Sequence, residues 1–252
     1  MTSIVVDVAP RAPARTAGVP PRTAGRIAGW GILAMALIAA FAEFSVRQRL
    51  VVPDDATATA TNLMAHELLW RFGIAAFLVV IVLDVVVAWA LYYLFKPVNK
   101  PVSGLMAMSR LVFATVFAVA VVNLSTAVDL VTDASSRATS DAGELNAQMM
   151  LSLNAFSSAW SVSLAFFGIH LALAGYLALT SGYMPKALGI ALVIAGLGYA
   201  FDTFAGLLVR NYEPTAALFT FVGEVALFLW LLIRNAKIPT TNSAGAASTR
   251  RA

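Results

Sequence analysis

The sequence contains no cysteine and only two histidines among its 252 residues. The missing thiols exclude disulfides, thiolate metal ligands and cysteine nucleophiles, and two imidazoles are too few for an ordinary transition-metal site. We therefore expect no metal and no other cofactor. Charge is also scarce, because only 12% of the residues are Asp, Glu, Lys or Arg, about half the share found in soluble domains.

Long apolar runs take the place of the missing charge, and 60% of the residues are hydrophobic. A helix needs about 20 apolar residues to cross a bilayer, so the chain has room for six crossings and no separate soluble domain. We predict an all-α integral membrane bundle, a single domain at 23–234. The expected spans are 26–46, 69–95, 102–130, 149–179, 186–209 and 215–233.

Both ends of the chain are polar and lack apolar periodicity. Residues 1–22 hold four prolines and three arginines, and residues 235–252 are basic and rich in Ala, Ser and Thr. We expect both segments to be disordered tails. The apolar run that begins near residue 26 is longer than the core of a signal peptide and has no convincing cleavage site, so it should remain as the first span.

The distribution of charge predicts the orientation. With the amino terminus inside, the cytoplasmic segments carry eleven of the 17 basic side chains against one acid, Asp7, whereas the outer segments carry five arginines against eight acids. By the positive-inside rule, both termini are cytoplasmic. The net charge of +4 then reflects topology, and we expect membrane lipids rather than nucleic acid as partners, in a bacterial cytoplasmic (inner) membrane. The oligomeric state stays open.

Six ionisable residues remain inside the expected spans. Counting from the cytoplasmic ends at ~1.5 Å per residue places four of them roughly 14–18 Å deep: Asp84, Arg110, His170 and Glu224. Glu43 and Asp202 come out roughly 24–26 Å deep, in an outer layer. Ionisable groups in a membrane face the bundle interior and need partners. The sequence therefore predicts a buried polar layer as the candidate site.

The polar layer has two interpretations. Arg110 could pair with Asp84 or Glu224 and only fix helix register, or the set could bind a ligand or handle protons. The first function we consider is non-enzymatic, with binding of a small ligand or lipid head group or a role in assembly. A proton-linked small-molecule transporter is the alternative, and Gly196–Gly198 is its one hint of a broken helix. An enzyme with His170 as general base ranks last because no nucleophile motif accompanies it.

Several short motifs accompany these residues. They include Lys96-Pro97-Val98-Asn99, Phe167-Gly168-x-His170, Ser181-Gly182-Tyr183-x-Pro185, Asp202 and Gly223-Glu224. Over about residues 24–234 the chain resembles a family of bacterial multi-pass membrane proteins known as domain of unknown function 4386. The resemblance implies six spans and no known activity. One tempting motif fails, because His66-Glu67 lacks the second histidine of a zinc-protease helix and has Trp70 instead.

Overall fold

The computed structural model describes residues 18–133, 138, 140–210, 212 and 217–239, and its regular elements over these residues are all helical. The tails expected before residue 18 and after residue 239 lie outside this range. In chain order the elements are α1 (Pro21–Ala40), η1 (Phe41–Arg47), α2 (Gln48–Leu50), α3 (Ala56–Ala65), α4 (Glu67–Phe95), α5 (Lys100–Thr132), α7 (Ala142–Thr180), α8 (Lys186–Leu208), α9 (Ala217–Ile233) and η2 (Asn235–Lys237).

Five helices are long and apolar enough to cross a membrane. The first runs without a break from α1 through the π-helical turn η1 to α2, and the others are α4, α5, α7 and α8. The last helix, α9, supplies a shorter apolar stretch at Val222–Ile233. Large apolar side chains such as Leu37 and Val119 point outward and are more than 60% exposed, as expected for helices in contact with lipid. The prediction of an all-α membrane bundle is thereby confirmed.

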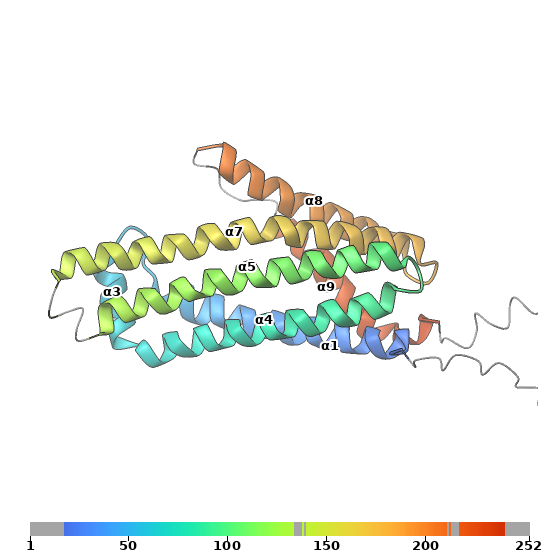
Figure 1. Ribbon diagram of the computed structural model, residues 1–252, viewed down its shortest axis with the longest axis horizontal. Helices are drawn as coiled ribbons and strands as arrows, with labels where there is room; N and C mark the ends of the chain where they lie inside the picture. Colours follow the sequence, from blue (N-terminus) through green and yellow to red (C-terminus); the bar gives the residue numbers. More distant parts are fainter. Residues whose placement is uncertain (1–17, 134–137, 139, 211, 213–216, 240–252) are drawn as a thin grey trace, which may run out of the picture.

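The six helices form a closed ring. Each packs on the next in chain order, and α9 completes the circle by packing on both α8 and α1. Figure 1 shows α1, α4, α5 and α7 lying lengthwise beside one another, while α8 leans away from the bundle. This arrangement matters for function because a ring of six helices can enclose a space to which every helix contributes.

Polar caps set several helix boundaries. Asp55 accepts a hydrogen bond from the Ala58 amide at the start of α3, and Asn99 accepts one from the Val102 amide at the start of α5. Asp141 caps α7 in the same way. Because of this cap and the buried Leu145, α7 begins seven residues before the expected span at 149. Helix α5 ends at Thr132, two residues past the expected end at 130.

Glycines bring α7 and α8 into close contact. A Cβ atom added at Gly168 would lie 2.5 Å from the Gly196 carbonyl oxygen, and one at Gly175 would lie 2.6 Å from the Gly189 oxygen. Small residues allow this approach between helices in a membrane. Helix α8 is continuous through Gly196, so the helix break suggested by Gly196–Gly198 is wrong. The glycines of α7 and α8 serve close packing instead.

Both ends of the described chain lie at one end of the bundle (Figure 1). Arg22 Nη2 donates to the Ala236 carbonyl at 2.6 Å, and Asn235 donates to the Arg22 carbonyl at 3.0 Å. Ile238 is fully buried. Helix α1 thus starts within the last residues of the segment expected as a tail. Residues 235–238 are folded against the start of α1, because hydrogen bonds to Arg22 and the burial of Ile238 hold them there.

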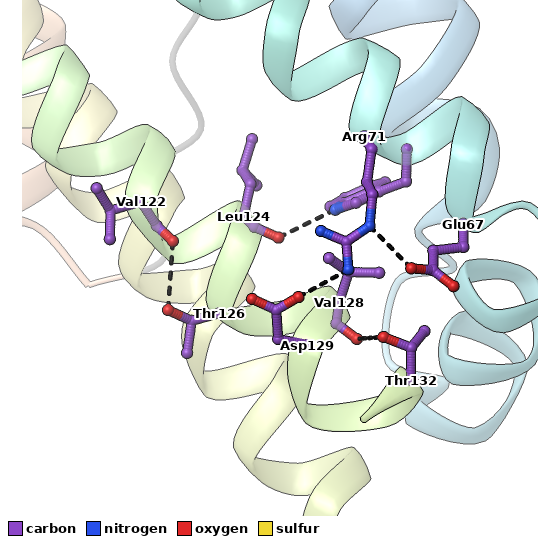
Figure 2. Close-up of polar contacts among 9 residues, drawn as sticks. Glu67, Arg71, Val122, Leu124, Thr126, Val128, Asp129 and Thr132 are labelled. Atoms are coloured by element: carbon purple, nitrogen blue, oxygen red, sulfur yellow. Dashed lines mark hydrogen bonds and ion pairs between the residues drawn. The ribbon is translucent and has the colours of Figure 1, made fainter. Parts of the chain in front are cut away.

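The opposite end of the bundle carries an exposed ion-pair network, which Figure 2 shows. Arg71 on α4 binds Glu67 at 2.8 Å and Asp129 on α5 at 2.9 Å. Trp70 donates from its indole nitrogen to the Leu124 carbonyl at 3.0 Å. These contacts tie α4 to α5. The neighbouring His66 is exposed, and no group of acids and histidines among the described residues is arranged to hold a metal ion.

Candidate binding cavity

A buried ion pair lies at the centre of the ring. Arg110 Nη2 on α5 is 2.7 Å from Asp84 Oδ1 on α4, and the two side chains are 4% and 0% exposed. Of the two partners that the sequence offered for Arg110, the structure brings Asp84 into direct contact. Charges so far from water require this kind of mutual compensation.

His170 on α7 completes a three-residue chain. Its Nε2 lies 3.1 Å from Arg110 Nη1, and its Nδ1 lies 3.0 Å from the Met106 carbonyl oxygen. A guanidinium can only donate hydrogen bonds and a carbonyl can only accept them. His170 Nε2 must therefore accept and Nδ1 must carry the proton, so the imidazole is the neutral Nδ1–H tautomer. Both ring nitrogens are occupied by structural hydrogen bonds.

Two further side chains surround the guanidinium. The Met35 sulfur on α1 accepts from Arg110 Nη2 at 3.8 Å, and the Phe167 ring on α7 lies 5.3 Å from Arg110 Cζ, within cation–π range. The sequence reasoning missed both, because thioethers and aromatic rings look like ordinary core residues. The position of Phe167 one helical turn before His170 was the one available signal.

Glu224 on α9 lies close to this chain but binds elsewhere. Its Oε1 accepts a hydrogen bond of 3.0 Å from the Tyr199 hydroxyl on α8, and it lines the same cavity as Asp84 and Arg110. The four residues expected at one depth are thus brought together, with His170 behind Arg110 rather than at the cavity wall.

The cavity itself measures about 460 Å³ and is lined by all six helices of the ring. Most of its wall is apolar and aromatic, and its polar groups gather at two ends. The lining includes Ile32, Met35, Ala36, Ala39, Phe77, Val80, Phe113, Phe117, Phe156, Trp160, Leu164, Phe167, Val225 and Phe228. Asp84, Arg110 and Glu224 form the polar wall at the inner end.

A second polar group lies at the outer end of the cavity. Arg47 Nε donates to Glu43 Oε2 at 2.7 Å, and the Arg47 guanidinium lies 5.5 Å from the Phe156 ring of α7. Glu43 and Arg47 both belong to η1, and π-helical turns of this kind are common at functional sites. Asp202, expected in the same outer layer, instead accepts a 2.6 Å hydrogen bond from Tyr212 and does not contribute to the described cavity wall.

The cavity reaches the molecular surface at this outer end. Phe44 and Gln48 both line it, and both are exposed. Farther in, Trp160 and Leu164 are half-buried, while Asp84 and Arg110 are almost inaccessible. The site is therefore a cavity with an exposed outer mouth, an aromatic middle and a polar inner end.

Comparison with known proteins places the chain in a family. The family model described as Domain of unknown function (DUF4386) matches residues 27–234. An uncharacterized protein from Archaeoglobus fulgidus is 35% identical over 167 residues, which cover 66% of this chain and 86% of that protein. Since this relative is archaeal, the family resemblance does not by itself indicate a bacterial source. No solved structure matches the chain. The chain belongs to the DUF4386 family of membrane-helix proteins.

Proposed function

We propose that this protein binds a small amphiphilic molecule, such as a membrane lipid or a lipid-soluble metabolite, inside the ring of helices. The observation that carries the proposal is the cavity of about 460 Å³ with aromatic walls and polar groups at both ends. Ligand sites of roughly 300–1,000 Å³ with mostly apolar linings and a few placed polar groups are typical of proteins that bind small molecules.

We propose further that the protein spans the cytoplasmic membrane six times with both termini inside. The joined ends of the described chain support an even number of crossings, and the excess of Lys and Arg at that end supports its cytoplasmic position. In this orientation the mouth of the cavity opens near the outer leaflet. Phe44 is 64% exposed there, and Phe41 is 43% exposed one turn earlier. Apolar surface at the mouth favours entry of the ligand from the bilayer.

The other functions have less support in the structure. The broken helix that a transporter would favour is absent from α8, which is continuous from Lys186 to Leu208. The general base that an enzyme would need, His170, is fully buried and engaged at both ring nitrogens. Binding requires neither feature and uses the cavity as it stands.

The proposal is tested by blocking the cavity. Ala39 lines the cavity and is half-buried, so Ala39→Trp should fill it, whereas Val119→Trp adds the same ring to an exposed face of α5. Mass spectrometry of detergent-purified protein should detect a co-purified small molecule with the wild type and with Val119→Trp, and much less of it with Ala39→Trp. Equal amounts in all three proteins, or none in any, would contradict the proposal.

A further inference from the structure

We infer that the ligand of this cavity carries a positively charged head group, which Glu224 and the neighbouring aromatic rings receive at the inner end. This inference rests on the proposed binding function and adds the chemical class of the ligand. It is carried by an excess of acidic over basic side chains in the cavity wall, by the free oxygen of Glu224, and by the rings beside it.

The charges of the described cavity wall do not balance. Three carboxylates and two guanidiniums line it, and they are Glu43, Asp84, Glu224, Arg47 and Arg110. Arg47 is bound to Glu43 and Arg110 is bound to Asp84. Glu224 is the carboxylate left over within this described wall. In a site of low dielectric constant, a carboxyl group without a basic partner either holds a proton or binds a cation, and a cationic head group would favour its ionised form.

Glu224 is also held in a position to receive a ligand. Tyr199 donates to its Oε1, which fixes the carboxyl group on the cavity wall. Its Oε2 has no hydrogen-bond partner among the described residues and is not sealed in the protein interior. Glu224 is only half-buried, and it lines the cavity. A cationic or hydrogen-bond-donating head group would find its acceptor there.

Aromatic rings extend from this carboxylate into the cavity. The Tyr199 ring lies 5.6 Å from the Phe167 ring, edge to face, and the Phe167 ring lies 4.8 Å from the Phe113 ring. Trp160 adjoins Phe113 at 6.2 Å. Aromatic faces attract organic cations, and clusters of rings recognise quaternary ammonium groups in this way. The contact between Arg110 and Phe167 is an example within this site.

The same geometry disfavours an anionic head group. The Arg110 guanidinium already binds Asp84, His170 and Met35, and the arginine side chain is only 4% exposed. Arg47 is similarly bound to Glu43. An anion would have to displace one of these partners and would meet a like charge wherever Glu224 is ionised. A like-charge contact of this kind is costly where water is excluded.

The test compares two probes of nearly equal size and opposite charge. Protein in nanodiscs of uncharged zwitterionic lipid is dialysed against tetraphenylphosphonium or tetraphenylborate, and specific binding is the amount bound above that of Ala39→Trp. We expect saturable binding of the cation to the wild type. Glu224→Gln, which keeps an acceptor for Tyr199, should weaken it about tenfold or more, as expected for a lost charge pair in a partly buried site. Glu224→Asp should retain most of it.

Glu144→Gln is the matched control, because Glu144 is an exposed acid at the start of α7, away from the cavity wall. It should bind the cation as the wild type does. If tetraphenylborate or the neutral probe N-phenyl-1-naphthylamine binds specifically and tetraphenylphosphonium does not, the inference on charge is wrong and the cavity proposal stands. If Glu224→Gln binds the cation unchanged, the role of Glu224 is wrong. If none of the three probes binds specifically, the binding function itself is contradicted.

Discussion

Removing either partner of the Asp84–Arg110 pair should destabilise the protein, but not equally. Asp84→Leu leaves a guanidinium that is 4% exposed and has lost its carboxylate. Arg110→Leu leaves a carboxyl group that is 0% exposed. A carboxyl group can take up a proton and become neutral, whereas a guanidinium cannot lose one at any accessible pH. The Asp84 variant should therefore be the less stable of the two.

The magnitudes follow from the burial of the pair. Breaking a buried ion pair by removing one partner costs about 3–5 kcal/mol, because the other charge is left uncompensated. We expect a loss near the upper end of that range for Asp84→Leu and near the lower end for Arg110→Leu. The double variant removes both charges and should recover about half of the larger loss or more. It will not recover fully, because His170 Nε2 then loses its donor.

The assay is reversible unfolding in mixed micelles with increasing denaturing detergent, followed by circular dichroism. The control is Arg71→Leu, which breaks the exposed pair with Glu67 in Figure 2, where the arginine side chain is 45% exposed. Exposed pairs contribute about 0–1 kcal/mol. If Arg110→Leu costs no more than Arg71→Leu, or if the double variant is no more stable than Asp84→Leu alone, our reasoning about the pair is refuted.

Three further predictions follow from other parts of the structure. Lys100 and Ala142 are exposed and are the first residues of α5 and α7, and these two helices start at opposite ends of the bundle (Figure 1). An impermeant thiol reagent on intact cells should therefore label Ala142→Cys and not Lys100→Cys; the reverse pattern would invert the topology. His170→Gln can both accept and donate hydrogen bonds and should unfold like the wild type, whereas His170→Leu should lose about 1–3 kcal/mol; equal losses would contradict the assigned hydrogen bonds. Gly196→Ala should destabilise the protein by about 1–3 kcal/mol, because α7 backbone atoms occupy the space that the added Cβ needs. Gly104→Ala meets no atom within 4 Å and should stabilise the protein by about 0.5–1 kcal/mol. A harmless change at Gly196 would contradict the close packing.

The depth of the polar residues could be predicted from the sequence because a helix rises by a fixed distance per residue. That arithmetic placed Asp84, Arg110 and Glu224 at one level, and they do line one cavity. It could not decide which acid binds Arg110, because depth says nothing about the order of helices around a ring. The order is set by packing, which places α4 beside α5 and places α9 between α8 and α1.

Other features had no signal in the sequence pattern. The π-helical turn at Phe41–Arg47 changes the face on which Glu43 and Arg47 lie, and apolar periodicity does not reveal such a turn. Asp202 looked equivalent to Glu43 by depth, but α8 leans away from the bundle (Figure 1), and Asp202 binds Tyr212 instead. The cavity depends on side chains from six helices, so no single stretch of the chain could predict it.

The most direct test of the central claim is photolabelling with an uncharged alkyl alcohol that carries a diazirine near its chain end. We expect saturable labelling of peptides from both α1 and α7, at residues that line the cavity, such as Met35 and Trp160. Ala39→Trp should abolish this labelling and leave that of the lipid-exposed Leu37 unchanged. Labelling confined to Leu37 and other outward-facing residues, and growing linearly with probe concentration, would show that the cavity binds no amphiphile.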